Sequence, residues 1–465
     1  MTGRHPDSAT AAVLVVSMAL LAFTLFVHPT TAPALQYDES WWGLLIQRIA
    51  TEPGHWPVFG MSSYTLTHHQ YLPAALFRWL GPSVALLRFM PKLEVLAGVG
   101  LISAALHLSG RSLAGALLPG LIAFFPALVM NQRWTVELTT FSVLVTGLVA
   151  FGLALRRKQG PTPLSNALLL AGAWLGVTCH ILLLAPLMAL WFWLWSYGLI
   201  RTRQDRRLVT VTAIGIVAFV AAVLLREKRA LEIGALGLAV LGAAAVSWIE
   251  FPESLRTWAR RIVMLPGLLI LIPFAVHLDG NWQALQYTGD LAQPLWRGAI
   301  LIPFGLLLWF SRNELRSSVP RSALSLLPVS LIAAQSMVGR LGARFLEVPF
   351  LMVAVALALL AARLPLRRLL VFAAVWAVTG GGLLWQNYFE PCIHERQVAR
   401  TFRLGRIMKD SSEDFVSKMP VVRRLGEQGC GLEALPEIDR GPELRFLALG
   451  DWPVSGGPCQ IQEIR

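Results

Sequence analysis

Long apolar segments recur along most of this chain, and they constrain its fold more than any other feature. A helix needs about 20 apolar residues to cross the hydrocarbon core of a bilayer. Segments of this kind must be helical, because lipid cannot satisfy backbone hydrogen bonds. The chain is therefore predicted to be an all-α, polytopic membrane protein. We expect thirteen transmembrane helices, at about 9–28, 86–108, 113–130, 136–155, 164–179, 182–200, 208–225, 231–249, 262–278, 297–311, 322–338, 345–362 and 369–387.

The composition agrees with a membrane protein and argues against a nucleic-acid-binding one. Of 465 residues, 55% are hydrophobic and only 14% are charged, whereas soluble domains are about 25% charged. The net charge of +13 comes from short basic runs between apolar segments. Such runs are typical of cytoplasmic loops, so we expect the lipid bilayer as a partner and no nucleic acid.

The basic runs also predict an orientation in the cytoplasmic membrane. We interpret the first apolar segment as an uncleaved anchor with a cytoplasmic N-terminus. The inside loops then carry the basic runs, and the acidic loops and the C-terminal tail lie outside. One outside turn, 226–229, breaks the rule. The inside runs are at 111, 156–158, 201–207, 256–261, 312–321 and 363–368.

Two regions outside the membrane are predicted to carry structure of their own. Within a membrane domain of residues 1–387, the first outer loop spans 29–86 and contains two interfacial helices, Trp41 to Ala50 and Tyr71 to Leu80. Residues 388–465 form a small extracytoplasmic α/β domain, with strand-like runs at 444–449 and 460–464. A disulfide between Cys430 and Cys459 suits that compartment, but the pairing among these two and Cys392 stays open.

An acidic pair, Asp38-Glu39, directly follows the first apolar segment and precedes Trp41 and Trp42. One reading is a pair of solvated loop charges. The other is a catalytic site, because further ionisable residues gather at the outer helix ends: Arg88, Lys92, Glu137, His180, Arg340 and Arg344.

This set of residues suits a particular chemistry. A carboxylate can act as a general base, and an arginine fork matches phosphate oxygens. Together they indicate transfer from a lipid-phosphate donor at the membrane surface. Adjacent helical residues diverge by about 100°, so one acid of the pair would face the reacting hydroxyl. The other would position that hydroxyl or hold a metal.

The same stretches resemble the GT-C glycosyltransferases, which use polyprenyl-phosphate sugars and include the protein mannosyltransferases and the aminoarabinose transferases of lipid A. The resemblance covers about the first 180 residues and 340–360. It rests on Tyr37-Asp38-Glu39, on His68-His69-Gln-Tyr-Leu-Pro73, on Gly81 to Pro91, on Arg133 and Glu137, and on Arg344-Phe-Leu-Glu-Val-Pro349. Two features depart from the family pattern: Trp134-Thr-Val separates Arg133 from Glu137 without a proline, and only His180 follows the fifth span.

The resemblance implies roles for these residues. Asp38 would be the catalytic base, supported by Glu39, and Glu137 a second acid. Arg344 would contact the donor phosphate, and His68 or His69 would bind substrate or a divalent metal, the one cofactor left open. Donor and acceptor would be a polyprenyl-phosphate sugar and a glycan, lipid or protein hydroxyl, reacting with inversion. The outer-face clustering adds Arg340, Arg88, Lys92 and His180 as substrate or phosphate contacts.

Two other functions remain open. A transporter or flippase of lipid-linked sugars would place its site near mid-membrane, at broken helices. The collection of acids on one face and the near absence of mid-depth charges weigh against it. A non-enzymatic assembly subunit is the third interpretation, favoured if Asp38 has no catalytic role. The sugar, acceptor, lipid length, metal dependence and oligomeric state are not fixed by these residues.

The orientation gives a first testable prediction. Thirteen spans from a cytoplasmic N-terminus place the tail outside, so a reporter that is active only outside the cytoplasm, fused after Arg465, should be active. A matched cytoplasm-active reporter at the same position should be silent. The reverse pattern would mean that the number of spans is wrong by one, and the tail disulfide would lose its basis.

Overall fold

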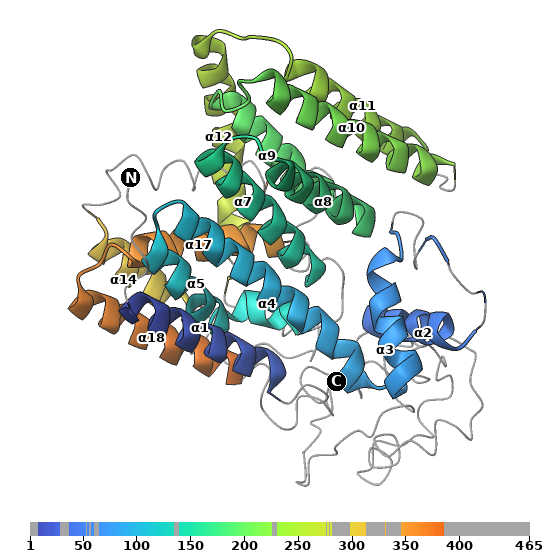
Figure 1. The fold of residues 1–465 in the computed structure, drawn as a ribbon. Coiled ribbons are helices and arrows are strands. Elements are labelled where there is room, and N and C mark those ends of the chain that lie inside the picture. Colours follow the sequence, from blue (N-terminus) through green and yellow to red (C-terminus); the bar gives the residue numbers. More distant parts are fainter. Residues whose placement is uncertain are drawn as a thin grey trace, which may run out of the picture.

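The computed structural model describes residues 8–27, 37–52, 54, 57–59, 65–133, 139–225, 230–275, 277–278, 280, 298–312, 331 and 346–385. In these ranges the chain forms a bundle of helices (Figure 1). The helices are α1 (Ser8–Phe26), α2 (Tyr37–Thr51), η1 (His68–Gln70), α3 (Tyr71–Leu80), α4 (Val84–Leu108), α5 (Ser112–Ala123), α6 (Pro126–Gln132), α7 (Phe141–Gln159), α8 (Pro163–Cys179), η2 (Ile181–Leu183), α9 (Leu184–Ser196), α10 (Arg203–Leu224), α11 (Ala230–Val246), α12 (Glu253–Ala275), α14 (Leu301–Phe310), α17 (Glu347–Ala361) and α18 (Leu366–Leu384).

The fold agrees with a multi-pass membrane protein. Four described helices are long and apolar enough to cross a membrane, and a bent pair of shorter helices makes up to five. Every predicted segment other than 322–338 overlaps a described helix. The segment 322–338 lies outside the described residues apart from Leu331, as does the whole of the predicted domain 388–465. The count of thirteen therefore stays a prediction.

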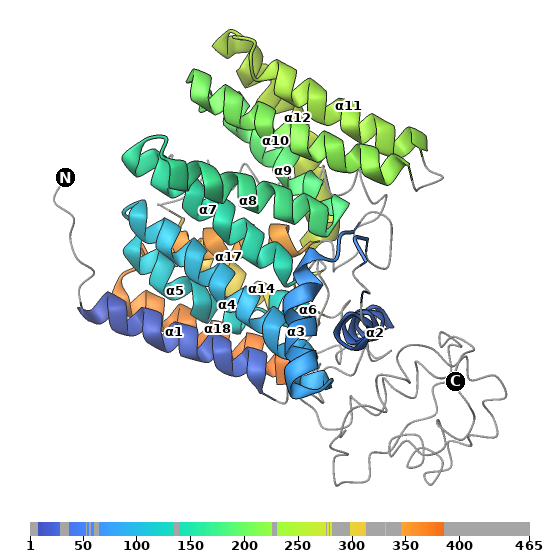
Figure 2. The ribbon, with the colours of Figure 1, turned by 45° about the vertical axis from the view of Figure 1, so that its right-hand side comes forward.

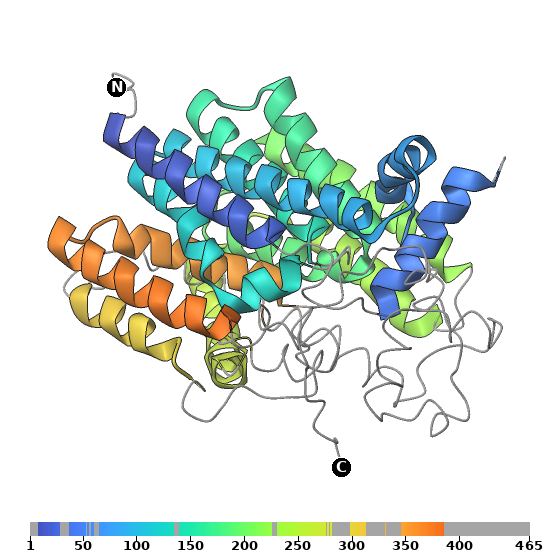
Figure 3. The same cartoon turned by 90° about the horizontal axis from the view of Figure 1, so that it is seen from below.

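The described residues form three hydrophobic cores, and the two largest hold most of the helices together. In the larger one, α1 packs along α5, and α17 packs on α5, around the buried rings of Phe125, Phe350 and Trp376. Helices α14 and α18 lie side by side at its edge (Figure 3). The smaller core joins α8 and α9 to the hairpin of α10 and α11. Helix α7 lies between the two halves, against α4 on one side and α8 on the other.

The segment predicted as one straight span at 113–130 is instead broken. Helices α5 and α6 meet at an angle of 72°. Pro126 is the cause, because it is the first residue of α6 and forces Phe125 into extended backbone, at φ −97° and ψ 101°. Trp376 closes the corner by donating its indole N–H to the carbonyl of Leu121 at 2.9 Å.

The two predicted interfacial helices are present, with one correction. Helix α3 has the predicted bounds and ends at Gly81, whose φ of 83° favours glycine. Helix α2 begins at Tyr37 rather than Trp41, so Asp38 and Glu39 belong to a helix and not to a loop. Both helices lie at the end of the bundle where α1 ends and α4 begins (Figure 2); we call it the α2–α3 end.

Arginines gather at the opposite end, which we call the basic end. Arg156 of α7 binds Asp205 of α10 at 2.5 Å and Asn166 of α8 at 2.5 Å. Arg206 binds Glu250 at 2.7 Å, and Arg260 donates to the Ser196 carbonyl at 2.6 Å. The positive-inside rule would place this end in the cytoplasm, and the orientation remains a prediction.

Glycines let α4 and α7 approach closely. A Cβ added at Gly147 would lie 2.5 Å from the Gly98 carbonyl oxygen, and one at Gly98 would collide with the Val143 carbonyl. Small residues at such crossings are typical of membrane helices, where packing rather than hydrophobic burial drives association.

A side chain at this crossing should therefore separate the helices. Gly98→Val is expected to lower the free energy of unfolding by about 1–3 kcal/mol, the usual cost of overpacking, measured by thermal unfolding in detergent. Gly100→Val is the matched control on the same helix, because a Cβ there meets no atom within 4 Å. Equal losses in both variants would contradict the assigned role of the crossing.

Candidate functional site at the α2–α3 end

The acidic pair stands in the first turn of α2, and the rest of that helix is firmly anchored. Trp42, 2% exposed, packs its ring against His69 with centroids 5.2 Å apart. At the other end of α2, Arg78 of α3 donates its Nε–H to the Ala50 carbonyl at 2.9 Å. The helix that carries Asp38 and Glu39 is thus fixed to the bundle one turn after the acids.

The histidine pair links the first outer loop to the bundle. The Leu66 N–H donates to the Thr178 carbonyl at 2.8 Å, which ties the residues before η1 to the end of α8. His68 and His69 pack their rings against Phe141, the first residue of α7, at 5.9 and 5.6 Å.

His69 is held as a neutral imidazole. The Gln70 side-chain nitrogen lies 2.6 Å from Nε2 of His69, so the amide donates to an unprotonated nitrogen and the ring proton resides on Nδ1. Nδ1 faces Cys179 Sγ at 3.7 Å. Burial and the neighbouring His68 lower the pKa of His69 from 6.5 to about 3, and burial lowers the pKa of His68 as well.

The ring of His69 is not placed to bind a metal ion. Among the described residues, no group of three or more His, Cys, Asp or Glu side chains is placed to hold an ion. Both ring nitrogens of His69 already face protein atoms. These contacts give His69 a part in positioning α2, and a divalent metal at His68 or at the acidic pair stays a prediction.

Arg88 and Lys92 are brought together inside the same end. They lie one turn apart on α4, and each is 1% exposed. Lys92 Nζ lies 5.6 Å from the ring centre of Phe26, the last residue of α1, and Phe89 packs on the same ring at 5.7 Å. Buried cations are rare in membrane helices and mark functional regions; the role of this pair in binding an anion stays a prediction.

A hydrogen-bonded bridge joins three distant parts of the chain at the end of α1. Glu347, the first residue of α17, accepts from Asn131 Nδ2 at 3.1 Å and from Gln132 Nε2 at 2.7 Å. Arg133 donates to the Thr24 carbonyl at 2.5 Å and also to the Val27 carbonyl, at the end of α1. All four side chains are at most 1% exposed. We call this set the buried bridge.

Of the other predicted site residues, the structure describes some and not others. His180 caps η2, where its Nδ1 accepts from the Leu182 N–H at 3.2 Å, so part of its role is structural. Glu137, Arg340 and Arg344 lie outside the described residues, and their roles stay predictions. The side chains of Asp38 and Glu39 lie outside them too, although their backbone is described in α2.

The sequence did not predict the buried bridge. Arg133 was singled out for its spacing to Glu137, and Glu347 as part of a late motif, but not as partners in one region. The available signal was the polar run Asn131-Gln132-Arg133 directly after an apolar segment broken by Pro126. Three consecutive polar residues at that depth require buried partners.

Some solved structures resemble this chain in fold. No protein-family model matches the chain, and no curated protein matches it. The crystal structure of the Archaeoglobus fulgidus oligosaccharyltransferase complex with Zn and sulfate is 13% identical, with a TM-score of 0.48 over 87% of this chain. This chain spans 56% of that one.

Two further similar structures are of ArnT from Cupriavidus metallidurans. The apo form is 14% identical, with a TM-score of 0.43 over 95% of this chain and 76% of that chain. The form bound to undecaprenyl phosphate is 14% identical, with a TM-score of 0.37 over 77% and 79%. Likenesses at this level do not decide a function.

The lowered pKa of His69 predicts how stability depends on pH. Below about pH 6.5 the unfolded chain binds a proton that the folded protein does not bind until about pH 3. Stability should therefore be complete above pH 6.5 and fall toward pH 3, by up to about 1.4 kcal/mol per pH unit. The measurement is thermal unfolding in detergent between pH 7.5 and 4. His69→Gln, which does not titrate, should show a shallower fall, and an unchanged slope would contradict the assignment.

Proposed function

We propose that this protein is a membrane glycosyltransferase of the GT-C type. It transfers a sugar from a polyprenyl-phosphate donor to an acceptor hydroxyl at the outer face of the cytoplasmic membrane. One observation carries the proposal: the acidic pair opens an anchored helix, α2, at the same end of the bundle as the buried cations Arg88 and Lys92. A base and an anion contact are the two elements that this reaction needs.

Asp38 is the general base in this proposal. It takes the proton from the acceptor hydroxyl while the hydroxyl oxygen bonds to the anomeric carbon. The bond from that carbon to the phosphate oxygen breaks on the opposite side, so the configuration inverts and polyprenyl phosphate leaves. Glu39 orients the acceptor and Glu137 is a second acid. A positioned base of this kind contributes roughly 100-fold or more to the rate.

The cations stabilise the leaving phosphate. Arg344 is assigned the direct contact with Arg340 beside it, because a guanidinium binds two phosphate oxygens at once. Arg344 precedes Glu347 of the buried bridge by only three residues in the sequence. Arg88 and Lys92 have low exposure on α4, so their positive charge would act through a low dielectric and be weakly screened.

The residue resemblance to the GT-C family supports this reaction class. The family's first-loop acid corresponds to Asp38, and its short helix after a His/Pro stretch corresponds to α3, which the structure contains with the expected bounds. The sugar and the acceptor stay undefined, since both depend on pocket shape rather than on fold.

A transporter is the second candidate, favoured by the break between α5 and α6. Discontinuous helices in transporters expose backbone groups to a substrate. Here the polar side chains that follow the break form hydrogen bonds within the protein: Asn131 and Gln132 bind Glu347, and Arg133 binds the end of α1. The break therefore acts as a structural joint, which favours the enzyme.

The test of the proposal is the Asp38→Asn variant. Asparagine keeps the size and hydrogen bonding of aspartate but accepts no proton at neutral pH. Transfer of labelled sugar from a polyprenyl-phosphate donor, in membranes with matched protein levels, should fall roughly 100-fold or more, with donor binding little changed.

Two further variants provide comparisons. Glu39→Gln should lose less activity if Glu39 only orients the site. Glu52→Gln makes the same chemical change just beyond the far end of α2, where the Glu52 carboxylate pairs with Arg48 at 3.0 Å, and should leave transfer unchanged. Near-normal transfer by Asp38→Asn would refute the assigned base, and a loss confined to Glu39→Gln would identify the other acid as the base.

A further inference from the structure

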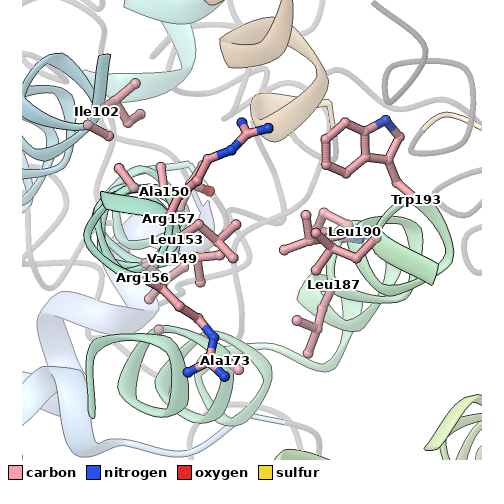
Figure 4. A pocket seen from close by; sticks show the side chains of 18 of the residues that line it. Ile102, Val149, Ala150, Leu153, Arg156, Arg157, Ala173, Leu187, Leu190 and Trp193 are labelled. Carbon is pink, nitrogen blue, oxygen red and sulfur yellow. The ribbon is translucent and has the colours of Figure 1, made fainter. Parts of the chain in front are cut away.

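A large cavity runs along α7, between α7, α8, α9 and α17. Its volume is about 650 Å³, within the range of small-molecule binding pockets. Val149 and Leu153 of α7 face Leu187, Leu190 and Trp193 of α9 across it (Figure 4). Its walls are almost entirely aliphatic and aromatic over most of its length, so a polar solute would find few partners inside.

The cavity becomes charged at one end only. Arg156, Arg157, Arg201 and Asp205 line it there, at the basic end of the bundle. Arg156 is held by Asp205 and Asn166, and Arg201 donates its Nε–H to the Gly198 carbonyl at 2.6 Å.

Arg157 differs from these two arginines. It is exposed, and it makes no hydrogen bond or ion pair with any residue that the structure describes. Figure 4 shows its guanidinium extending from α7 on the side away from Arg156. An available arginine thus stands at the mouth of an apolar cavity.

The direction of α7 places this mouth relative to the membrane. The helix begins at Phe141, against the histidines of the α2–α3 end, and ends at the basic run 156–158. The mouth therefore lies at the opposite end of α7 from the candidate catalytic site. Basic pockets between membrane helices on the cytoplasmic side are suited to anionic lipid headgroups.

We propose that the cavity binds an anionic phospholipid of the cytoplasmic leaflet, with its acyl chains between α7 and α9 and its phosphate on Arg157. The apolar walls match acyl chains, and the arginine fork matches phosphate oxygens. A zwitterionic lipid would bring its own cation next to three arginines and is disfavoured. This site is independent of the proposed glycosyl transfer.

Native mass spectrometry of the full chain, delipidated in detergent, tests the proposal. The probes are phosphatidylglycerol, phosphatidylcholine with the same acyl chains, and a prenyl phosphate. The expected result is at least tenfold tighter binding of phosphatidylglycerol than of the other two. Arg157→Ala should reduce it about tenfold. Lys158→Ala, the matched control, removes a neighbouring exposed charge outside the cavity lining and should leave it unchanged.

A second pair of variants tests the apolar part of the site. Leu153→Trp fills the cavity and should abolish phosphatidylglycerol binding, whereas Leu164→Trp on the exposed surface of α8 should retain it. Equal binding of the two phospholipids, or equal losses in Arg157→Ala and Lys158→Ala, would overturn the proposal. So would Arg157-dependent binding of prenyl phosphate that exceeds phosphatidylglycerol binding, because the cavity would then belong to a prenyl lipid.

Discussion

The cost of burying polar groups in an apolar bundle determines how one end of this protein is built. Asn131, Gln132, Arg133 and Glu347 are all at most 1% exposed, and each would strongly destabilise the fold without a partner. The Glu347 carboxylate accepts from the side-chain nitrogens of Asn131 and Gln132, and Arg133 donates to the carbonyls at the end of α1. Because those partners come from α1, α6 and α17, the same bonds fix the relative positions of three helices that are far apart in the sequence.

The proposed site depends on these fixed positions. The chain leaves α1 just beyond the carbonyls that Arg133 holds and then enters α2 with its acidic pair. Near the other end of the chain, Glu347 fixes the start of α17 directly after the stretch that carries Arg340 and Arg344. The proposed base, Asp38, therefore follows a helix that the buried bridge holds. The proposed phosphate contacts, Arg340 and Arg344, precede another helix that the same bridge holds.

Local patterns predicted the elements of this fold better than their relationships. The apolar segments, the bounds of α3 and the helical nature of α2 followed from periodicity and from breakers such as Gly81. The start of α2 at Tyr37 was missed because the apolar periodicity that predicted this helix begins only at Trp41. The 72° break at Pro126 was missed because the apolar run is continuous across it. The pairing of Asn131 with Glu347 spans 216 residues, and no local spacing encodes a contact of that kind. The catalytic roles of Asp38, Glu137 and Arg344 remain predictions.

The close crossing of α4 and α7 has a consequence for how the protein assembles in the membrane. Lipid tails are as apolar as leucine side chains, so inserted helices gain little from hiding apolar surface and associate through shape. The contact at Gly98 and Gly147 needs no other helix to form. Helix α7 also carries Arg156, which binds Asn166 of α8 and Asp205 of α10. A pair made of α4 and α7 can therefore form early, as soon as both helices have left the insertion machinery, and act as the template on which the later helices dock.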